Sequence, residues 1–474
     1  MHTTQLLTLS TQELALFGRR VEDLLEQRGI TIEHAAMREA LAQAGALVEN
    51  DRVRFPRSLI HKAVQAVPST FTLCAPDPQW NLTFPHPHQG FYTRTNTGAM
   101  QYLPKEGEVR PVTLADVAEW TRLANALPHI HFLCLPSTSG EEVPIHSIDL
   151  CTLDVMLRLS RKHIWVQPYE APNVRCMIDL AAASVGGYEK LRSASPISFI
   201  SCSVPVLHYK EMDAEVLWQC AQYGIPVQCC SLPTAGANAP VTGQGVALLA
   251  CAEVLAQIVM LELLAPGTPA IATPLLFSMD MMTTFTLQSN TQITLGRLIA
   301  MQYFEQELNI RAHSYGTGTD SVVLDSQNML ERSSLAHMMG LCPASILGGA
   351  GQLETAKTIS PLQLIIDDGL FDTVQQLRQG LDITDETLDF QELLHGTGEE
   401  GFITSDHTLE HYQELHRPEL YNRSGIQGGT STLLQRAAHR MDELLLHPSQ
   451  RDLPPQVVAA MDEALHKGLE VLEG

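Results

Sequence analysis

Two histidines and a glutamate near the C-terminus have the spacing of a metalloprotease motif. His407, Glu410 and His411, within "SDHTLEHYQELHRPELYNRS" (405–424), follow the order H-x-x-E-H. In one class of zinc proteases this order places two metal ligands and a general base on one helical face. Here the proline in "HRPEL" (416–420) ends the helix at once. We therefore predict no metal site at these residues.

Two adjacent cysteines, Cys229 and Cys230, are a second candidate for zinc. A zinc ion that activates a thiol substrate needs three protein ligands and an open fourth position. Cys342 or His313 is a conceivable third ligand. Neighbouring residues of a strand point to opposite faces, so the two thiols are not expected to share one ion. The favoured interpretation is that they pack as small apolar groups in the core.

Aromatic, carboxylate and other polar residues follow many of the hydrophobic runs in the middle of the chain. Ring faces and carboxylates both stabilise a quaternary ammonium, so such a set suits a pocket for a compact cation. The predicted substrate-binding residues are Tyr92, Tyr169, Glu170, His208, Tyr209, Phe277, Asp280, Met281, His313, Tyr315, Asp320, Gln352 and Glu354.

Two glycine-rich stretches, "YGTGTD" (315–320) and "LGGAGQLE" (347–354), stand at the ends of hydrophobic runs. Neither continues into the Lys-Ser/Thr of a phosphate-binding P-loop. Glycine at a strand end also lets a large flat ligand or another protein approach the backbone closely. The glycines predicted to contact a cofactor are Gly316, Gly318, Gly348 and Gly349.

Short β-type runs alternate with long helical runs through the middle of the chain. Hydrophobic strands that alternate with helices indicate parallel pairing with helical crossovers. The pattern predicts a (β/α)₈ TIM barrel, in which the site lies at the C-terminal ends of the strands. An eighth strand is expected between residues 355 and 405. A doubly wound sheet is the alternative, but no GxGxxG opens a helix. The predicted strands cover 129–136, 163–169, 197–206, 225–232, 269–278, 310–318 and 344–351.

Both ends of the chain are expected to extend the barrel. Residues 1–68 have a helical apolar period, and 71–109 have the texture of a β-hairpin region. The last part, 427–472, contains two further helical patterns. We therefore expect three domains: an extension over 1–112, a catalytic barrel over 113–404 and a C-terminal helical extension over 405–474.

Composition limits the classes of partner. The 474-residue chain has a net charge of −23, which argues against nucleic acid because that partner needs clustered Lys and Arg. The most apolar stretch, 246–264, includes two glutamates and a glutamine, so it predicts a buried helix and not a membrane span. The ten cysteines have no regular spacing, and the N-terminus lacks a signal-peptide pattern. A cytoplasmic enzyme with reduced thiols is expected.

Seven ordered blocks resemble the trimethylamine methyltransferase (MttB-like) family of corrinoid-dependent methyltransferases. The resemblance runs from about residue 20 to residue 445, and it includes the H-x-x-E-H stretch, which carries no zinc in that family. The blocks are "RFPRSLIHKAVQAVPSTFTL" (54–73), "RPVTLADVAEWTRLANALPHI" (110–130), "TAGANAPVTGQGVALLACAEVLAQIV" (234–259), "TDSVVLDSQNMLE" (319–331), "GGAGQLE" (348–354), "SPLQLIIDDGLFD" (360–372) and "HTLEHYQELHRPELYNRS" (407–424).

The resemblance implies a TIM barrel that moves a methyl group from a methylated amine to the cobalamin of a separate corrinoid protein. The founding trimethylamine enzyme uses pyrrolysine to activate a tertiary amine, whereas this chain consists of standard residues. A quaternary amine is already activated. The implied substrate is therefore a betaine such as glycine betaine, proline betaine, carnitine or butyrobetaine, within the one-carbon metabolism of anaerobes. A homo-oligomer without a tightly bound metal is expected.

One block departs from the family pattern. Where many members read close to TDAKxPDxQAGYE, this chain lacks the Lys, Pro and Tyr, whereas Asp320, Asp325, Gln327 and Glu331 remain. The departure affects the identity of the substrate more than the class of reaction. The carboxylate of a betaine needs a hydrogen-bond donor, and the candidates are Arg94, His208, His313 and backbone amides.

Two other functions stay open at this point. One is a zinc-dependent, thiol-directed methyltransferase that uses Cys229 and Cys230. The other is a non-catalytic paralogue that binds a betaine or docks a corrinoid protein without turnover, which the altered segment 322–330 motivates.

Overall fold

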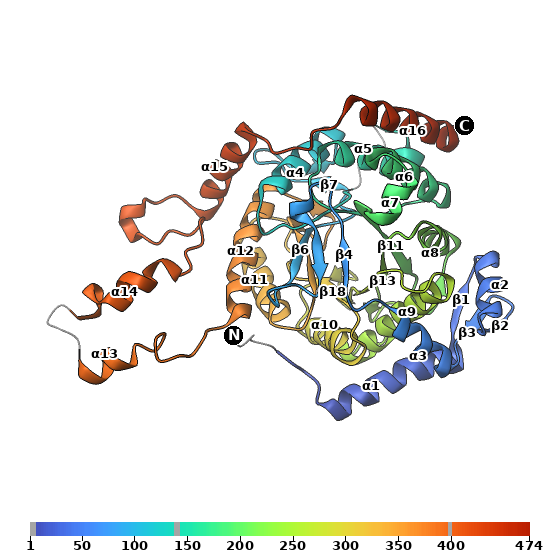
Figure 1. Ribbon diagram of the computed structural model, residues 1–474, viewed down its shortest axis with the longest axis horizontal. Coiled ribbons are helices and arrows are strands. Elements are labelled where there is room, and N and C mark those ends of the chain that lie inside the picture. Colours follow the sequence, from blue (N-terminus) through green and yellow to red (C-terminus); the bar gives the residue numbers. More distant parts are fainter. Residues whose placement is uncertain (1–5, 137–142, 397–400) are drawn as a thin grey trace.

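The computed structural model describes residues 6–136, 143–396 and 401–474. A ring of strands surrounded by helices forms the body of the molecule, and the two ends of the chain lie outside this ring (Figure 1). The fold is a TIM barrel, as the alternation of strands and helices predicted.

Within the described residues, eight parallel strands close the barrel. Hydrogen-bonded ladders join most neighbouring strands. The bridge Arg94–Phe132 joins β6 to β9, and the bridge Ala272–Ala312 joins β15 to β18. The order around the ring is therefore β6-β9-β10-β11-β13-β15-β18-β19, and β19 returns to β6. The strands are β6 (Tyr92–Thr95), β9 (Leu133–Cys134), β10 (Ile164–Val166), β11 (Ile197–Ser203), β13 (Val227–Ser231), β15 (Ala270–Pro274), β18 (His313–Tyr315) and β19 (Ile346–Ala350).

The expectation of an eighth strand between 355 and 405 is wrong. The missing strand is β6, which comes before the others and pairs in parallel with β19. Its sequence, YTRT, is polar, and yet all four residues are buried. Residues 361–379 instead form the helix α12 (Pro361–Gln379). The barrel thus takes its first strand from the segment expected to be an N-terminal hairpin.

A helix follows each barrel strand and covers the outside of the ring (Figure 1). Caps fix several of their first turns: the Thr113 and Asp116 side chains form a capping box on α4, and the Asp325 side chain accepts from the Asn328 amide on α11. The helices are α4 (Leu114–Ala126), α5 (Ile148–Leu159), α6 (Ala171–Val185) with α7 (Tyr188–Ser193), α8 (Glu211–Tyr223), α9 (Gly243–Leu264), α10 (Thr291–Gln302), α11 (Ser326–Gly340) and α12.

The helix α9 is apolar on all sides. Among the described residues it is the one helix that is long and apolar enough to cross a membrane by length and composition. In this fold 89% of its most apolar window is buried against the barrel and neighbouring helices. A helix buried on all sides needs no polar face, which explains this composition.

The apolar period of residues 1–68 predicted helices alone, but the N-terminal extension also contains strands. Between the helices α1 (Thr11–Asp23), α2 (Ala35–Gln43) and α3 (Arg57–Ala66) lie the strands β1 (Ile30–Ile32), β2 (Leu47–Glu49) and β3 (Arg52–Arg54). They form an antiparallel sheet in the order β1-β3-β2. On its other edge, β1 pairs in parallel with β12 (His208–Tyr209), which follows barrel strand β11. The extension is thus joined to the barrel by a ladder.

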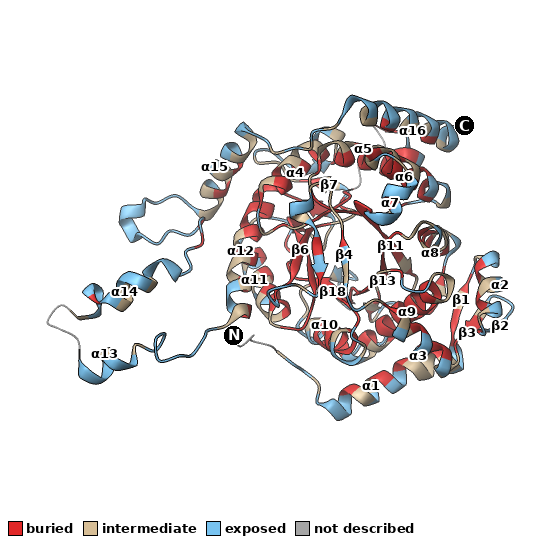
Figure 2. Cartoon of the chain, in the orientation of Figure 1, coloured by how far each residue is buried: buried red, intermediate tan, exposed pale blue. Residues whose placement is uncertain are grey.

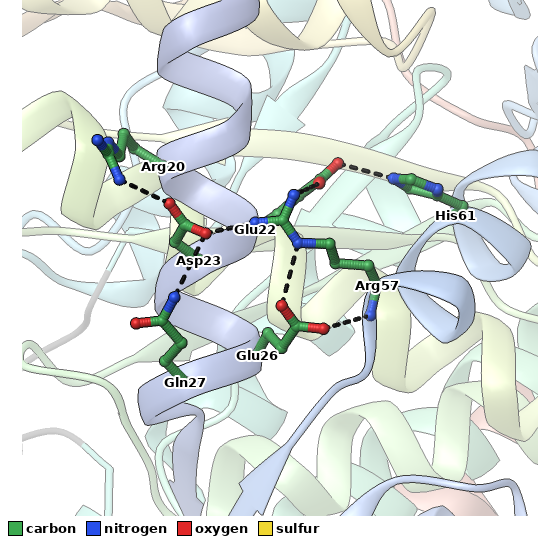
Figure 3. A network of polar contacts seen from close by, with 7 residues as sticks. All are labelled: Arg20, Glu22, Asp23, Glu26, Gln27, Arg57 and His61. Atoms are coloured by element: carbon green, nitrogen blue, oxygen red, sulfur yellow. Dashed lines mark hydrogen bonds and ion pairs between the residues drawn. The ribbon is translucent and has the colours of Figure 1, made fainter.

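Ion pairs join α1 to α3 on the outer side of this extension (Figure 3). Arg57 lies among three carboxylates: its Nε is 3.0 Å from a Glu26 oxygen, its Nη1 is 3.5 Å from Glu22, and its Nη2 pairs with Asp23. The imidazole of His61 lies 2.9 Å from the second Glu22 oxygen. The network lies at the surface, so it sets the position of α1 more than it contributes stability.

The hairpins predicted within 71–109 are present. One pairs β4 (Phe71–Leu73) with β5 (Leu82–Phe84), and the other pairs β7 (Gln101–Tyr102) with β8 (Arg110–Pro111) around the "KEGEV" turn. Short strands also extend the later loops. They are β14 (Thr234–Ala235), β16 (Phe277–Met279), β17 (Thr286–Leu287), β20 (Gln352–Leu353) and β21 (Thr358–Ile359).

The two predicted C-terminal helices, α15 (Leu433–Leu446) and α16 (Pro455–Glu473), pack on the barrel's outer helices. Between α12 and α15, residues 380–396 and 401–432 form an arm that extends away from the body and includes α13 (Phe390–His395) and α14 (Asp406–His411). Most of the arm is exposed (Figure 2). The division into domains at 112/113 and 404/405 stays a prediction.

Candidate functional site

A buried arginine, Arg94, stands at the centre of the barrel. Its Nε–H donates to His313 Nε2 at 2.9 Å, and its Nη1 donates to the Thr95 carbonyl at 2.8 Å. The guanidinium carbon lies 4.1 Å above the Trp165 ring and 5.6 Å from the Tyr315 ring. Four barrel strands, β6, β10, β18 and β9 through Cys134, thus meet around one cation.

The local sequence leaves space for this cation. Gly348 on β19 faces the same interior, and a Cβ there would lie 2.6 Å from the Arg94 guanidinium carbon and 2.5 Å from His313 Nε2. These distances are below any tolerable contact. Gly348 is therefore needed where Arg94 and His313 meet.

His313 is neutral in this environment. Burial is the main reason that its pKa lies well below the ordinary value, and the neighbouring Arg94 charge lowers the pKa further. Because Nε2 accepts from Arg94, the ring proton is on Nδ1. Nδ1 has no hydrogen-bond partner among the described residues.

The charge of Arg94 also lacks a counterion in the described part of the chain. No ion pair between Arg94 and a carboxylate occurs there, and its Nη2 has no hydrogen-bond partner. An arginine side chain does not give up its proton in proteins. The centre therefore combines a fixed positive charge with two free donors, Arg94 Nη2–H and His313 Nδ1–H.

Several predicted residues surround this centre. Tyr315 is buried, which raises the pKa of its hydroxyl, and its ring meets Phe277 edge-on at a centroid distance of 5.9 Å. Gln352 is buried and donates to the Thr317 carbonyl. The structure thus brings together His313, Tyr315, Phe277 and Gln352, which come from three different strand ends.

The predicted cofactor glycines are buried in the same region. A Cβ at Gly316 would lie 2.5 Å from Leu347 Cβ, one at Gly318 would lie 2.3 Å from Gln288 Oε1, and one at Gly349 would lie 2.3 Å from Gln352 Nε2. At these positions and at Gly348, the missing Cβ leaves space for neighbouring side chains of this chain. Packing alone therefore explains the glycines, and their contact with a cofactor stays a prediction.

Other predicted residues lie apart from this centre. The Tyr92 hydroxyl binds the backbone of Thr83, and the Tyr209 hydroxyl contacts Ser201. His208 lies on β12, where its Nε2 is 2.9 Å from a Glu33 oxygen in the N-terminal extension. Glu170 precedes α6 and pairs at 2.8 Å with His146, and its neighbour Tyr169 is partly exposed.

Three predicted carboxylates shape loops at the strand ends. Asp320 accepts from the backbone amides of Gln288 and Ser289, and Asp280 accepts from the amides of Met282 and Thr283. Glu354 accepts from the Thr358 hydroxyl at 3.1 Å. They hold the loops around the centre in place.

Exposed apolar side chains stand on the segments that follow the barrel strands. Met282 is 95% exposed. We call these residues the apolar rim, because the segments that follow barrel strands surround one end of the ring. The apolar rim consists of Met100, Ile145, Val206, Val241, Met281, Met282, Phe285, Val322 and Val323.

The two adjacent cysteines face different ways, as the alternation along a strand predicted. Cys230 is the register partner of Cys202 on β11, and a hydrogen bond between the two thiols raises the pKa of Cys202. Cys229 instead lies in the electrostatic reach of Glu262 on α9, and burial raises the pKa of its thiol. Among the described residues, no group of three or more His, Cys, Asp or Glu is placed to hold a metal ion.

The H-x-x-E-H residues lie on α14 in the exposed arm. The His407 and His411 rings are 4.4 Å apart, and His411 bonds Glu414 at 3.0 Å. They are therefore remote in the fold from the barrel centre, and each histidine lies beside a carboxylate of the arm itself.

A groove of about 740 Å³ lies between α6, α7 and α16. It is lined by residues of these helices and of the turn between α6 and α7, and none of them belongs to the barrel centre. Ligands of TIM-barrel proteins bind at the ends of the barrel strands and not between the outer helices, so the barrel centre stays the candidate site.

Sequence reasoning gave two residues of the centre too little weight. Arg94 was considered only as one of several donors, and Trp165 was absent from the candidates. Both lie inside short strands and not after them. A charged residue within a buried strand is the signal that identifies such a position.

A family model described as "Trimethylamine methyltransferase (MTTB)" matches residues 2–469. The chain belongs to this family. A trimethylamine methyltransferase MttB of Desulfitobacterium hafniense (strain DSM 10664 / DCB-2) is 26% identical over 95% of this chain and 92% of its own length. The glycine betaine methyltransferase of Desulfitobacterium hafniense (strain Y51) is 25% identical over 95% of each chain.

A solved structure has the same fold. The monomethylamine methyltransferase (MtmB) of Methanosarcina barkeri matches with a TM-score of 0.50, over 98% of this chain and 89% of that chain, at 12% identity. At this identity the likeness supports the fold alone. Family and fold thus agree on a methyltransferase built on a TIM barrel.

Proposed function

We propose that this methyltransferase takes a methyl group from a quaternary amine of the betaine class and transfers it to the cob(I)alamin of a partner corrinoid protein. The relationship to a glycine betaine methyltransferase over 95% of both chains supports this choice. The observation that carries it is the uncharged state of the titratable groups around Arg94, because that state suits a substrate that is already activated.

The leaving group decides which amine the centre suits. A tertiary amine must first become cationic before its C–N bond breaks, and this step needs a proton or another electrophile. Burial keeps His313 neutral and raises the pKa of the Tyr315 hydroxyl, so neither is a good acid at neutral pH. A quaternary ammonium needs no such acid, because it departs as a neutral tertiary amine.

The protein's own role is to position the substrate and to exclude water. The Tyr315 and Phe277 rings offer faces to an N-methyl cation, and the buried surroundings keep the reacting atoms away from solvent. No side chain has to form a covalent bond with the substrate.

The apolar rim fits a partner that presents a large corrinoid ring. Flexible methionine and aromatic side chains adapt to such a surface, and Met281, Met282 and Phe285 follow one barrel strand. When bound, the reduced corrinoid supplies the nucleophile that receives the methyl group. Because the chain's net charge is −23, contact through apolar residues also avoids repulsion from an acidic partner.

An anaerobic assay tests the reaction. The purified protein is mixed with reduced free cob(I)alamin and separately with glycine betaine, proline betaine, carnitine, butyrobetaine and trimethylamine, with and without its corrinoid protein, and the cob(I)alamin absorbance is followed. We expect conversion to methylcobalamin with a betaine and none with trimethylamine. Silence with every quaternary amine in the presence of the corrinoid protein would refute the proposal and leave the binding paralogue.

Oligomeric state and cellular location belong to the same proposal. We infer that the chain is cytoplasmic and that it forms a homo-oligomer. The oligomer is inferred because the described residues of the arm expose large apolar side chains such as Leu381, Ile403 and Ile426. Light scattering on the purified protein tests the oligomer. A monomer at micromolar concentration would contradict it.

The zinc-dependent alternative predicts stoichiometric zinc. It has no support in the positions of Cys229 and Cys230, which face different environments. Metal analysis of an active preparation decides it: we expect methyl transfer to persist after chelation, whereas loss of activity that zinc restores would favour this alternative.

A further inference from the structure

We propose that Arg94, assisted by His313, binds the carboxylate of the substrate, which makes a carboxylate on the quaternary amine a requirement for binding. This inference rests on the proposed function and assigns the residues that determine its specificity. It predicts a zwitterionic substrate and excludes simple tetraalkylammonium ions.

The first support is an unpaired buried donor. Arg94 is fully buried, and its Nη2 has no hydrogen-bond partner among the described residues. Buried polar groups in proteins are almost always hydrogen-bonded, and a buried charge without a partner is strongly unfavourable. A carboxylate is the group that satisfies a guanidinium best, through short charge-assisted hydrogen bonds.

The second support is that the remaining contacts hold Arg94 in one orientation. His313 fixes Nε, the Thr95 carbonyl and Cys134 Sγ fix Nη1, and the Trp165 ring lies 4.1 Å from the guanidinium carbon. A donor that is held in this way loses little conformational freedom when a ligand binds. The Nδ1–H of His313 is a further free donor, on the side of the ring opposite Nε2 and Arg94.

The third support comes from the chain's other buried arginines. Arg332 pairs with Asp367 at 2.8 Å, and Arg311 pairs with Glu305 at 3.2 Å. These two arginines pair with carboxylates, whereas the buried Arg297 and Arg378 donate to backbone carbonyls. Arg94 likewise has no carboxylate partner among the described residues, but it alone of these three lies on a barrel strand, beside His313 and the Trp165 ring. That position is where a carboxylate of the ligand is expected to bind.

The same charge selects against simple cations. A quaternary ammonium that enters the centre approaches the positive charge of Arg94 in surroundings of low polarity, where repulsion is strong. A carboxylate on the same molecule neutralises Arg94 and removes this repulsion. Arg94 therefore favours a betaine and disfavours the corresponding amine without a carboxylate.

Calorimetry without any corrinoid tests the assignment. Three matched pairs serve as probes: glycine betaine with choline, proline betaine with N,N-dimethylpyrrolidinium, and butyrobetaine with butyltrimethylammonium. For the wild type we expect at least one betaine to bind about 100-fold more tightly than the matched cation without a carboxylate. Arg94→Gln is expected to lower that ratio to within about threefold, and Arg94→Lys to retain part of it, because Lys keeps the charge but not the fork.

Arg297→Gln is the matched control. Arg297 is also fully buried, donates to the Leu276 carbonyl and has Nε and Nη1 without partners among the described residues. Arg297 also lies within electrostatic reach of Tyr315, so it is the competing position for the carboxylate. If Arg94 and not Arg297 binds the carboxylate, Arg297→Gln leaves the ratio unchanged. Thermal unfolding and circular dichroism confirm that each variant is folded, and Arg94→Lys keeps the test valid if Arg94→Gln does not fold.

The outcomes separate this inference from the proposed function. A ratio that survives Arg94→Gln, or that falls instead with Arg297→Gln, overturns the assignment even when methyl transfer occurs. Failure of all three betaines to bind overturns it as well. Binding of a betaine that depends on Arg94, without methyl transfer, upholds the carboxylate site and refutes the proposed reaction.

Discussion

Two buried arginines in this barrel have opposite surroundings. Arg332, on α11, pairs with Asp367 at 2.8 Å, donates to Asn328 Oδ1 at 3.0 Å and reaches the Gln352 carbonyl. Arg94, on β6, has a neutral imidazole, a backbone carbonyl and a thiol as partners, and no carboxylate in the described part of the chain. Both side chains are almost completely inaccessible to solvent.

The difference indicates that Arg332 stabilises the fold, whereas Arg94 is available to bind a ligand. The hydrogen bonds and the charge of Arg332 are satisfied by residues of the protein itself, which join α11, α12 and the loop after β19. The charge of Arg94 is satisfied only when an anion enters. An unpaired buried charge on a barrel strand is therefore a better guide to the site than loop carboxylates such as Asp280.

The largest expected effect on stability is at Arg332. Arg332→Met leaves Asp367 buried without its counterion, and loss of one partner of a buried pair costs about 3–5 kcal/mol. Urea unfolding measures the change, and the double variant Arg332→Met/Asp367→Asn is expected to recover part of it. A loss below about 1 kcal/mol would show that this pair does not hold the fold.

A smaller loss is expected when the space around Arg94 is filled. In Gly348→Ala the new Cβ would lie 2.6 Å from the guanidinium carbon of Arg94, so one of the two groups must move. Overpacking of this kind costs about 1–3 kcal/mol, and affinity for the betaine should fall with it. Gly369→Ala is the control, because a Cβ there meets nothing within 4 Å. Unchanged affinity in Gly348→Ala would contradict the position of the site.

Glu262 shows how a buried carboxylate avoids the situation of Arg94. Burial raises the pKa of Glu262 to about 7, so protonation neutralises it in the folded protein. Below about pH 4.5, Glu262 is protonated in both the folded and the unfolded protein. As pH rises toward and through about 7, the unfolded protein loses this proton first, so the free energy of unfolding falls.

Glu262→Gln should therefore be more stable than the wild type at pH 8, by about 1–2 kcal/mol, and no more stable than it at pH 5. The glutamine oxygen still accepts the Gly267 amide that Glu262 binds at 2.7 Å. Urea unfolding at the two pH values measures the difference, with Glu39→Gln at the surface as the control. An advantage that is equal at both pH values would contradict the buried neutral carboxyl.

The smallest expected effect on stability is at Arg94 itself. Arg94→Met removes three hydrogen bonds but also removes an unpaired charge, so the free energy of unfolding should change by less than about 1 kcal/mol. Binding of the betaine should nevertheless be lost. Urea unfolding and calorimetry on one preparation measure both. A destabilisation as large as that of Arg332→Met would mean that Arg94 is part of the scaffold.

The barrel was predictable because seven of its strands are apolar runs that alternate with long helices. β6 was missed because YTRT lacks that signature: its polar side chains are buried against β9 and β19, and only closure of the ring reveals why. The same closure brings Arg94 beside His313, which lies 219 positions later in the chain. No local pattern encodes this contact.

The candidate residues divide in a similar way. Asp320 was predicted as a substrate-binding residue, and Asp325 and Glu331 are residues of the family pattern that remain in this chain. All three bind backbone amides or hydroxyls around the loop after β18. These three side chains therefore stabilise the conformation of the loop. His313 and Tyr315 were predicted because they end a strand, and their position inside the barrel brings them to Arg94 and Trp165.

A crystal structure with the betaine that the transfer assay selects would test the central claim most directly. We predict that its carboxylate bonds Arg94 Nη2, and that an N-methyl group points toward the apolar rim. A carboxylate that lies away from Arg94, or a betaine bound outside the barrel centre, would contradict the account.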